Sequence, residues 1–226
     1  MRALPQFRIA ALIGALCLCA QGQDPQSKAS QVNESKGIPP RAAPADYLTQ
    51  GQAGTVTIAA EFKGHSVPTP EATLTTEEYV VVEVALFGPP EARLKLSFED
   101  FAIRINGKKT PTPSAAYVSV FGSLRDPEWE PPAKTEAKSK TSIGGGGGGG
   151  REQSEGNMPP PVIHIPIELQ RAMQQKVRKA ALLEGDRALP QARLIFFQYR
   201  GKAQGIHSIE LIYAGPAGNA TLALQP

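Results

Sequence analysis

The stretch YVVVEVALF, residues 79–87, decides the fold of this 226-residue chain. Successive side chains of a β-strand point to opposite faces, so Val80, Val82, Val84 and Leu86 share one face and Glu83 lies on the other. Apolar residues on both faces, many of them β-branched, are typical of a strand buried inside a sheet. The stretch therefore predicts a central strand of a β-sandwich.

Shorter segments on both sides show the same alternation of apolar and polar residues. Asn106-Gly107 is a strong hairpin signal, and Pro111 and Pro113 restrict the strand after it to an edge or a short piece. The segments expected to be strands are residues 55–62, 94–98, 101–105, 117–121, 194–199, 206–213 and 221–224.

A long stretch without this alternation separates the early strands from the late ones. Residues 123–161 are rich in proline, lysine and glycine and include the seven glycines Gly144 to Gly150, which predicts a disordered insert. Neither half has enough strands to close a core alone. We therefore expect one sandwich of about 110 residues, made from residues 52–122 and 188–226.

One helix is expected within residues 162–187, running from Ile167 to Leu183. Pro166 suits its first turn and Gly185 suits its end. One side carries apolar residues and the other is polar and moderately basic, so the helix is amphipathic. The fold prediction is an all-β, immunoglobulin-like sandwich with one amphipathic helix in a long, partly disordered insert.

The N-terminal sequence has the pattern of an export signal. Residues 9–18 are apolar after a basic start, and Ala20-Gln21-Gly22 offers small residues for cleavage, so residues 1–22 predict a signal peptide. Cleavage would remove both cysteines, Cys17 and Cys19, and leave no disulfide. A lipid anchor on one of these cysteines is the first alternative, and an uncleaved membrane anchor is the second. Residues 23–51 are polar and proline-rich, which predicts a flexible leader.

Two stretches carry a resemblance to a known family. Tyr79 to Gly88 (YVVVEVALFG), followed by Leu96 to Lys108 (LSFEDFAIRINGK), resembles the bacterial secreted immunoglobulin-like domains of unknown function. Their pattern is a valine-rich strand followed by a Phe-x-Leu-x-x-x-Gly hairpin. The resemblance implies an envelope or extracellular module and brings no activity with it. Gly88-Pro89 and the glycine insert depart from the pattern.

The charge balance and the absence of catalytic or metal-binding motifs disfavour several classes of function. The chain has 24 basic and 21 acidic residues, and loss of Arg2 and Arg8 with the signal leaves 22 against 21, which does not favour nucleic acid as a partner. His65, His164 and His207 lack the spacing of zinc ligands, so a His164–His207 metal site is not favoured. We expect the acidic pairs Glu77-Glu78 and Glu99-Asp100 to lie in solvent-exposed turns. We therefore name no catalytic, metal-binding or cofactor-binding residue.

The function expected from sequence is an exported, non-catalytic binding or scaffolding module whose partner is a protein or another envelope component. Arg171, Arg178 and Lys179 on the helix are candidates for contact with a partner or an anionic membrane, and Trp129 is a candidate anchor in a loop. A lipidated cysteine would be the other route to a membrane. A secreted hydrolase whose site the sequence does not reveal and a lipid-anchored surface protein are the alternatives.

Overall fold

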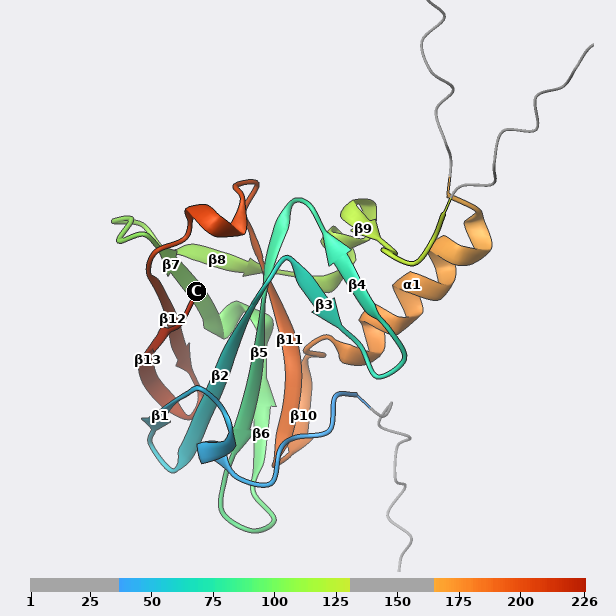
Figure 1. Ribbon diagram of the computed structural model, residues 1–226. Helices are drawn as coiled ribbons and strands as arrows, with labels where there is room; N and C mark the ends of the chain where they lie inside the picture. The colour runs from blue at the N-terminus through green and yellow to red at the C-terminus, as the bar shows by residue number, and fades with distance from the viewer. Residues whose placement is uncertain (1–36, 131–164) are drawn as a thin grey trace, which may run out of the picture. The chain divides into compact units, whose positions relative to one another are not determined.

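The structure is a computed structural model that describes residues 37–130 and 165–226 (Figure 1). Every ladder between its strands is antiparallel. The strands are β1 (Thr49–Ala53), β2 (Val56–Gly64), β3 (Ser66–Pro68), β4 (Thr73–Thr76), β5 (Tyr79–Phe87), β6 (Arg93–Leu96), β7 (Phe101–Ile105), β8 (Thr112–Ala115), β9 (Leu124–Arg125), β10 (Gly185–Ala188), β11 (Gln191–Gln198), β12 (Ile209–Gly215) and β13 (Gly218–Leu224). The α-helix is α1 (Ile167–Ala180), and the 3-10 helices are η1 (Pro44–Asp46), η2 (Phe98–Asp100), η3 (Tyr117–Ser123) and η4 (Ala203–Gly205).

Strand β5 is a central strand of an eight-stranded sheet, as its sequence predicts. The strand order is β1-β2-β5-β11-β8-β7-β12-β13. Val80, Val82, Val84 and Leu86 face the main core, and every residue of β5 except Phe87 is buried. Both faces of β5 are therefore covered, which explains its nearly continuous apolar sequence.

The early and late parts of the chain share one interior. Strand β11 lies between β5 and β8, and β12 pairs with β7. Side chains from both parts meet in the main core, among them Ile58 and Ile103 from the early part and Phe197 and Leu211 from the late part. The described residues of both parts belong to one compact unit.

The large sheet curls until its first and last strands face each other, which makes it barrel-like. The Thr49 hydroxyl in β1 donates to the carbonyl of Ala223 in β13 at 3.1 Å. A Cβ at Gly51 would lie 3.3 Å from Leu222 Cδ1, so glycine permits this close approach. The all-β prediction is confirmed, while the immunoglobulin-like arrangement of two facing sheets stays a prediction.

A second layer covers the outer face of β5 and β11. The small sheet β3-β4-β9 and helix α1 pack there (Figure 1). Met173, Val177 and Ala180 of α1 join Val81 of β5 and Phe196 of β11 in a second apolar cluster. Helix α1 thus uses its apolar side within its own fold.

Most predicted strands differ from the observed ones by one to three residues at an end, and four other predictions also differ from the structure. Residues 117–121 are not a strand but begin η3, and α1 ends at Ala180 instead of Leu183. The predicted leader runs too far, because β1 already begins at Thr49. The predicted insert begins too early, because Leu124–Arg125 forms β9. The glycine run, the signal peptide, Cys17, Cys19 and His164 lie outside the described residues.

Strand β8 shows which of the two outcomes expected from its prolines applies. The strand is short, as Pro111 and Pro113 suggest, but it lies between β11 and β7 and is not an edge. Each of its two ladders is brief, with Phe196↔Ala115 and Phe197↔Ser114 on one side. The ladder to β7 pairs only two residues of each strand, so the prolines shorten the pairing without excluding it.

An N-terminal strap, residues 37–47, crosses the outer face of β2 and β5 and brings a charge that this face requires. Glu61 and Glu83 lie directly opposite each other in the β2–β5 ladder, where like charges repel. Lys63 Nζ bridges them, at 2.8 Å from Glu61 and 3.0 Å from Glu83. Arg41 of the strap pairs with Glu61 and lies 3.8 Å from Glu83. Two cations therefore neutralise two carboxylates.

The strap also covers an apolar strip next to this charge cluster. Tyr47 is 5% exposed and packs with Ala59, Ala85 and Ala192. Its ring meets Phe87 edge-on at 6.1 Å between centroids, and the Arg41 guanidinium lies 4.4 Å from the Tyr47 ring centroid. The small alanine side chains leave room for the strap to lie close to the sheet.

We predict that Arg41→Gln lowers the free energy of unfolding by about 1–2 kcal/mol at pH 7, because Glu61 and Glu83 would keep only Lys63. Burial raises the pKa of Glu61, but hydrogen bonds from Lys63 and Arg41 outweigh it and hold this pKa below its ordinary 4.5. The stabilisation is therefore complete above pH 4.5 and is lost as the pH falls through the folded pKa. Urea unfolding at pH 7 and at pH 3 measures both effects.

Arg200→Gln is the matched control, because Arg200 pairs with Glu78 at 3.5 Å on an exposed surface. This control should change stability by no more than about 0.5 kcal/mol. Equal losses in the two variants would show that the charge cluster does not hold the strap.

Candidate functional site

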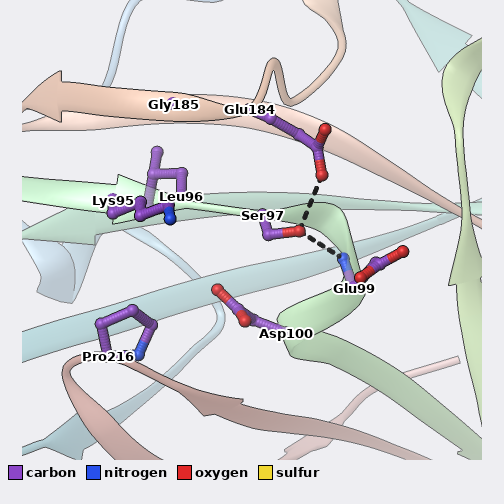
Figure 2. Close-up of a pocket in the computed structure, with 8 residues that line it drawn as sticks. All are labelled: Lys95, Leu96, Ser97, Glu99, Asp100, Glu184, Gly185 and Pro216. Carbon is purple, nitrogen blue, oxygen red and sulfur yellow. Dashed lines mark hydrogen bonds between the residues drawn. The ribbon is translucent and has the colours of Figure 1, made fainter.

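An open pocket of about 610 Å³ lies where three segments far apart in the sequence meet. The segments are β6 with the η2 turn after it, the start of β10, and the turn between β12 and β13 (Figure 2). Three carboxylates and one ammonium group line the pocket, which we call the carboxylate pocket. Its lining residues are Lys95, Leu96, Ser97, Glu99, Asp100, Glu184, Gly185 and Pro216.

Ser97 joins two of the three segments. Its hydroxyl donates to Glu184 Oε1 at 2.8 Å and accepts from the backbone N–H of Glu99 at 3.2 Å (Figure 2). The second bond caps the N-terminus of η2, which is an ordinary role for serine. The first bond holds the Glu184 carboxylate at the rim of the pocket. Glu99 and Glu184 are exposed, whereas Asp100 is partly buried.

Asp100 differs electrostatically from an ordinary surface aspartate. Burial raises the pKa of Asp100 above 3.8, and the neighbouring charges of Glu99 and Glu184 raise it further. A backbone hydrogen bond from Ser97 and the charge of Lys95 oppose this rise without cancelling it. The Asp100 carboxylate is therefore less stable as an anion than a solvated one, and a cation or hydrogen-bond donor entering the pocket would relieve this.

A buried tyrosine supports the wall that carries Pro216. The Tyr213 hydroxyl accepts the backbone N–H of Ala217 at 3.3 Å, which ties the β12–β13 turn to the sheet. A Cβ at Gly215 would lie 2.5 Å from that hydroxyl, so only glycine fits there. Burial raises the pKa of Tyr213, and the Asp100 charge adds to the rise. Tyr213 therefore lies close enough to Asp100 to sense its charge.

The pocket's chemistry suits recognition of positively charged or hydrogen-bond-donating groups. Carboxylates accept hydrogen bonds from ammonium and guanidinium groups, and such charge-assisted bonds are among the strongest in proteins. The lining contains neither histidine nor cysteine, and the Ser97 hydroxyl faces a carboxylate, which is a weak base for activating a serine. Among the described residues, no group of three or more histidines, cysteines, aspartates and glutamates is placed to hold a metal ion.

The residues predicted from sequence to contact a partner do not line this pocket. Arg171, Arg178 and Lys179 lie on the exposed side of α1, and Lys179 Nζ pairs with Glu71 Oε1 at 2.8 Å. Trp129 is only partly exposed, in a turn where its backbone N–H donates to the Asp126 carbonyl at 3.2 Å. The structure therefore brings the basic residues together on one helix and keeps Trp129 in a separate turn.

The two histidines in the described part of the chain, His65 and His207, form hydrogen bonds that connect loops and strands of the fold. His65 Nδ1 lies 2.8 Å from the carbonyl oxygen of Tyr79, and its Nε2 lies 2.9 Å from that of Gly201. The backbone N–H of His207 donates to Asn106 Oδ1 at 2.7 Å. Through this bond, the turn at Asn106-Gly107 holds the loop before β12. The hairpin predicted there is confirmed, because both residues have positive φ angles and β7 pairs with β8 in an antiparallel ladder.

The sequence contains only a faint signal for the carboxylate pocket. Glu99-Asp100 is adjacent to Ser97, a residue that commonly begins a helical turn, and this places two carboxylates at the end of a strand. Glu184 lies 84 residues later in the chain than Asp100. The acidic pair after a capping serine is the one sequence pattern that points to this pocket. The pairing of β6 with β10, which brings Glu184 close, cannot be predicted from the sequence.

No protein-family model, curated protein or solved structure matches this chain. Within the described ranges, none of the helices has the length and apolar character that a membrane crossing needs. The function must therefore be inferred from the site itself.

We predict that Asp100→Asn raises the free energy of unfolding at pH 7 slightly, by about 0.5 kcal/mol at most. The pKa of Asp100 is higher in the folded protein than its ordinary 3.8. The folded wild type therefore loses stability as the pH rises from 3.8 through the folded pKa, and the variant does not. Thermal unfolding at pH 7 and pH 3 should show a gain that disappears at the lower pH.

Glu91→Gln is the control for this measurement, because Glu91 is exposed and lies outside the pocket. Its stability should follow the wild type at both pH values. A loss of stability in Asp100→Asn at pH 7 would mean that the Asp100 charge stabilises the fold and is not held there at a cost.

Proposed function

We propose that this chain is an exported, non-catalytic binding module of the cell envelope, and that the carboxylate pocket receives a cationic group of its partner. The observation that carries the proposal is the position of Asp100. A partly buried carboxylate lies in an open pocket beside Glu99 and Glu184, with Lys95 as the one basic lining residue. The lysine or arginine side chain of a protein partner has the positive charge and donors that the excess of carboxylates in this pocket favours.

The architecture supports binding more than catalysis. The pocket is made by turns at the end of strands, and such positions commonly carry recognition on a rigid β-scaffold. The Ser97 hydroxyl and the Glu184 carboxylate are hydrogen-bonded to each other. A pocket organised in this way can hold a cation without any group having to change its protonation state.

The N-terminal sequence and the family resemblance support export and an envelope location. Residues 1–22 read as a cleavable signal, and secreted immunoglobulin-like domains are modules of the same kind of compartment. An immunoglobulin-like ancestry is part of this proposal, although the eight strands form one barrel-like sheet. Mass spectrometry of the N-terminus distinguishes a chain that begins at Gln23 from a lipid anchor on Cys17 or Cys19.

Isothermal titration calorimetry with a tetralysine peptide tests whether the carboxylate pocket binds cationic side chains. We predict that the wild type binds the peptide and that Asp100→Asn/Glu184→Gln weakens binding at least about tenfold, because two charge-assisted contacts are lost. Both substitutions keep a side-chain oxygen that can accept a hydrogen bond. A tetraglutamate peptide should not bind to the wild type.

The control variant Glu91→Gln/Glu128→Gln removes the same charge from exposed positions outside the pocket. It should bind tetralysine within about twofold of the wild type, since distant exposed charges are screened. Equal weakening in both double variants would show that the peptide responds to net charge alone, and the carboxylate pocket would not be the site.

A further inference from the structure

Two arginines on α1 differ from every other arginine in the described part of the chain. Arg171 and Arg178 form no hydrogen bond or ion pair there, and both are exposed. The other described arginines all have a partner: Arg41, Arg93, Arg104, Arg125, Arg187, Arg193 and Arg200. A free guanidinium keeps all five of its donors for a ligand.

The two guanidinium groups lie on one stripe of the helix together with an exposed isoleucine. At about 100° per residue, Ile167, Arg171 and Arg178 fall within about 40° of one another. Ile167 is 50% exposed, although its side chain is fully apolar. We call these three residues the outer stripe of α1.

The opposite side of the helix is already occupied. Met173, Val177 and Ala180 are buried against β5 and β11 in the second apolar cluster. The outer stripe can therefore meet a partner while α1 stays packed on its own sheet. The helix need not detach or refold in order to bind.

The charges around the outer stripe leave it positive. Glu168 is the one acidic residue of α1, against four basic residues: Arg171, Lys176, Arg178 and Lys179. Glu71 of the β3–β4 turn is already paired with Lys179 at 2.8 Å. Neither carboxylate pairs with Arg171 or Arg178, so among the described residues the stripe presents two cations without an acidic partner.

We propose that the outer stripe of α1 docks on an anionic phospholipid surface. Guanidinium groups bind phosphate through paired hydrogen bonds, and an isoleucine beside them can enter the boundary between headgroups and acyl chains. The half-exposed Ile167 favours a lipid surface over an acidic protein segment, which would satisfy the arginines but not the apolar side chain. This contact is separate from the carboxylate pocket and does not depend on it.

The test is co-sedimentation of the full chain with phosphatidylcholine vesicles that contain or lack phosphatidylglycerol. We expect binding only to the anionic vesicles, and we expect it to disappear at about 0.5 M salt because exposed charges are then screened. Arg171→Gln/Arg178→Gln should lower the partition coefficient by about 30-fold, as expected for two basic residues at such a surface. Ile167→Ser should lower it as well.

Lys108→Gln/Lys109→Gln is the matched control, because it removes two exposed positive charges at the turn after β7. The control should bind anionic vesicles like the wild type, and any contribution of the N-terminal apolar run is the same in every variant. Circular dichroism confirms that each variant is folded.

Three outcomes would overturn the proposal. The first is equal loss of binding in the arginine and lysine variants, which would mean attraction by net charge. The second is equal binding to neutral and anionic vesicles. The third is arginine-dependent binding to polyglutamate without binding to anionic vesicles, which would identify an acidic protein as the partner.

Discussion

The pairing of β5 with β11 is the constraint on which the rest of the structure depends. It joins a strand from the first half of the chain to one from the second half over eight residue pairs, from Gln191↔Leu86 to Gln198↔Tyr79. Alternate residues of both strands face the main core, while the others face the layer of α1 and the small sheet or the N-terminal strap. Glu83 is the one charged residue on β5, and it requires Arg41 and Lys63 beside it. The strap is thus a consequence of one polar residue in an apolar strand.

Much of the strand content could be predicted, because alternation is a local property of the sequence. The bounds of β5 and β7 and the turn at Asn106-Gly107 follow from patterns of a few residues. Residues 117–121 show why such patterns fail when they are short. Val120 and Ser123 are buried at a spacing of three residues, which fits a 3-10 helix as well as YVSVF fits a strand. The end of α1 depends on tertiary structure. The backbone N–H of Leu182 donates to the Leu194 carbonyl in β11 at 2.9 Å, so the chain leaves the helix before Leu183.

The candidate sites differ in how much of them is local. The outer stripe of α1 lies on one helix, so its basic residues could be named from the sequence alone. The lack of partners for Arg171 and Arg178 within residues 37–130 and 165–226 could not be predicted, because it depends on every acidic residue that folds nearby. The carboxylate pocket needs Glu184 beside Ser97, and this contact follows from the β6–β10 ladder. When a ladder between distant segments brings residues together, a single sequence contains no local pattern that predicts their contact.

The interleaving of early and late strands has a consequence for how the chain tolerates change in length. Residues 131–164 connect β9 to α1, and both ends of this connection are anchored in the same folded unit. The entropy of closing a flexible loop varies only with the logarithm of its length, so doubling such a loop costs about 0.6 kcal/mol. A change of length between two anchored ends is therefore cheap in comparison with a change inside a strand. Insertion within β5 or β11 would shift every side chain beyond it to the wrong face.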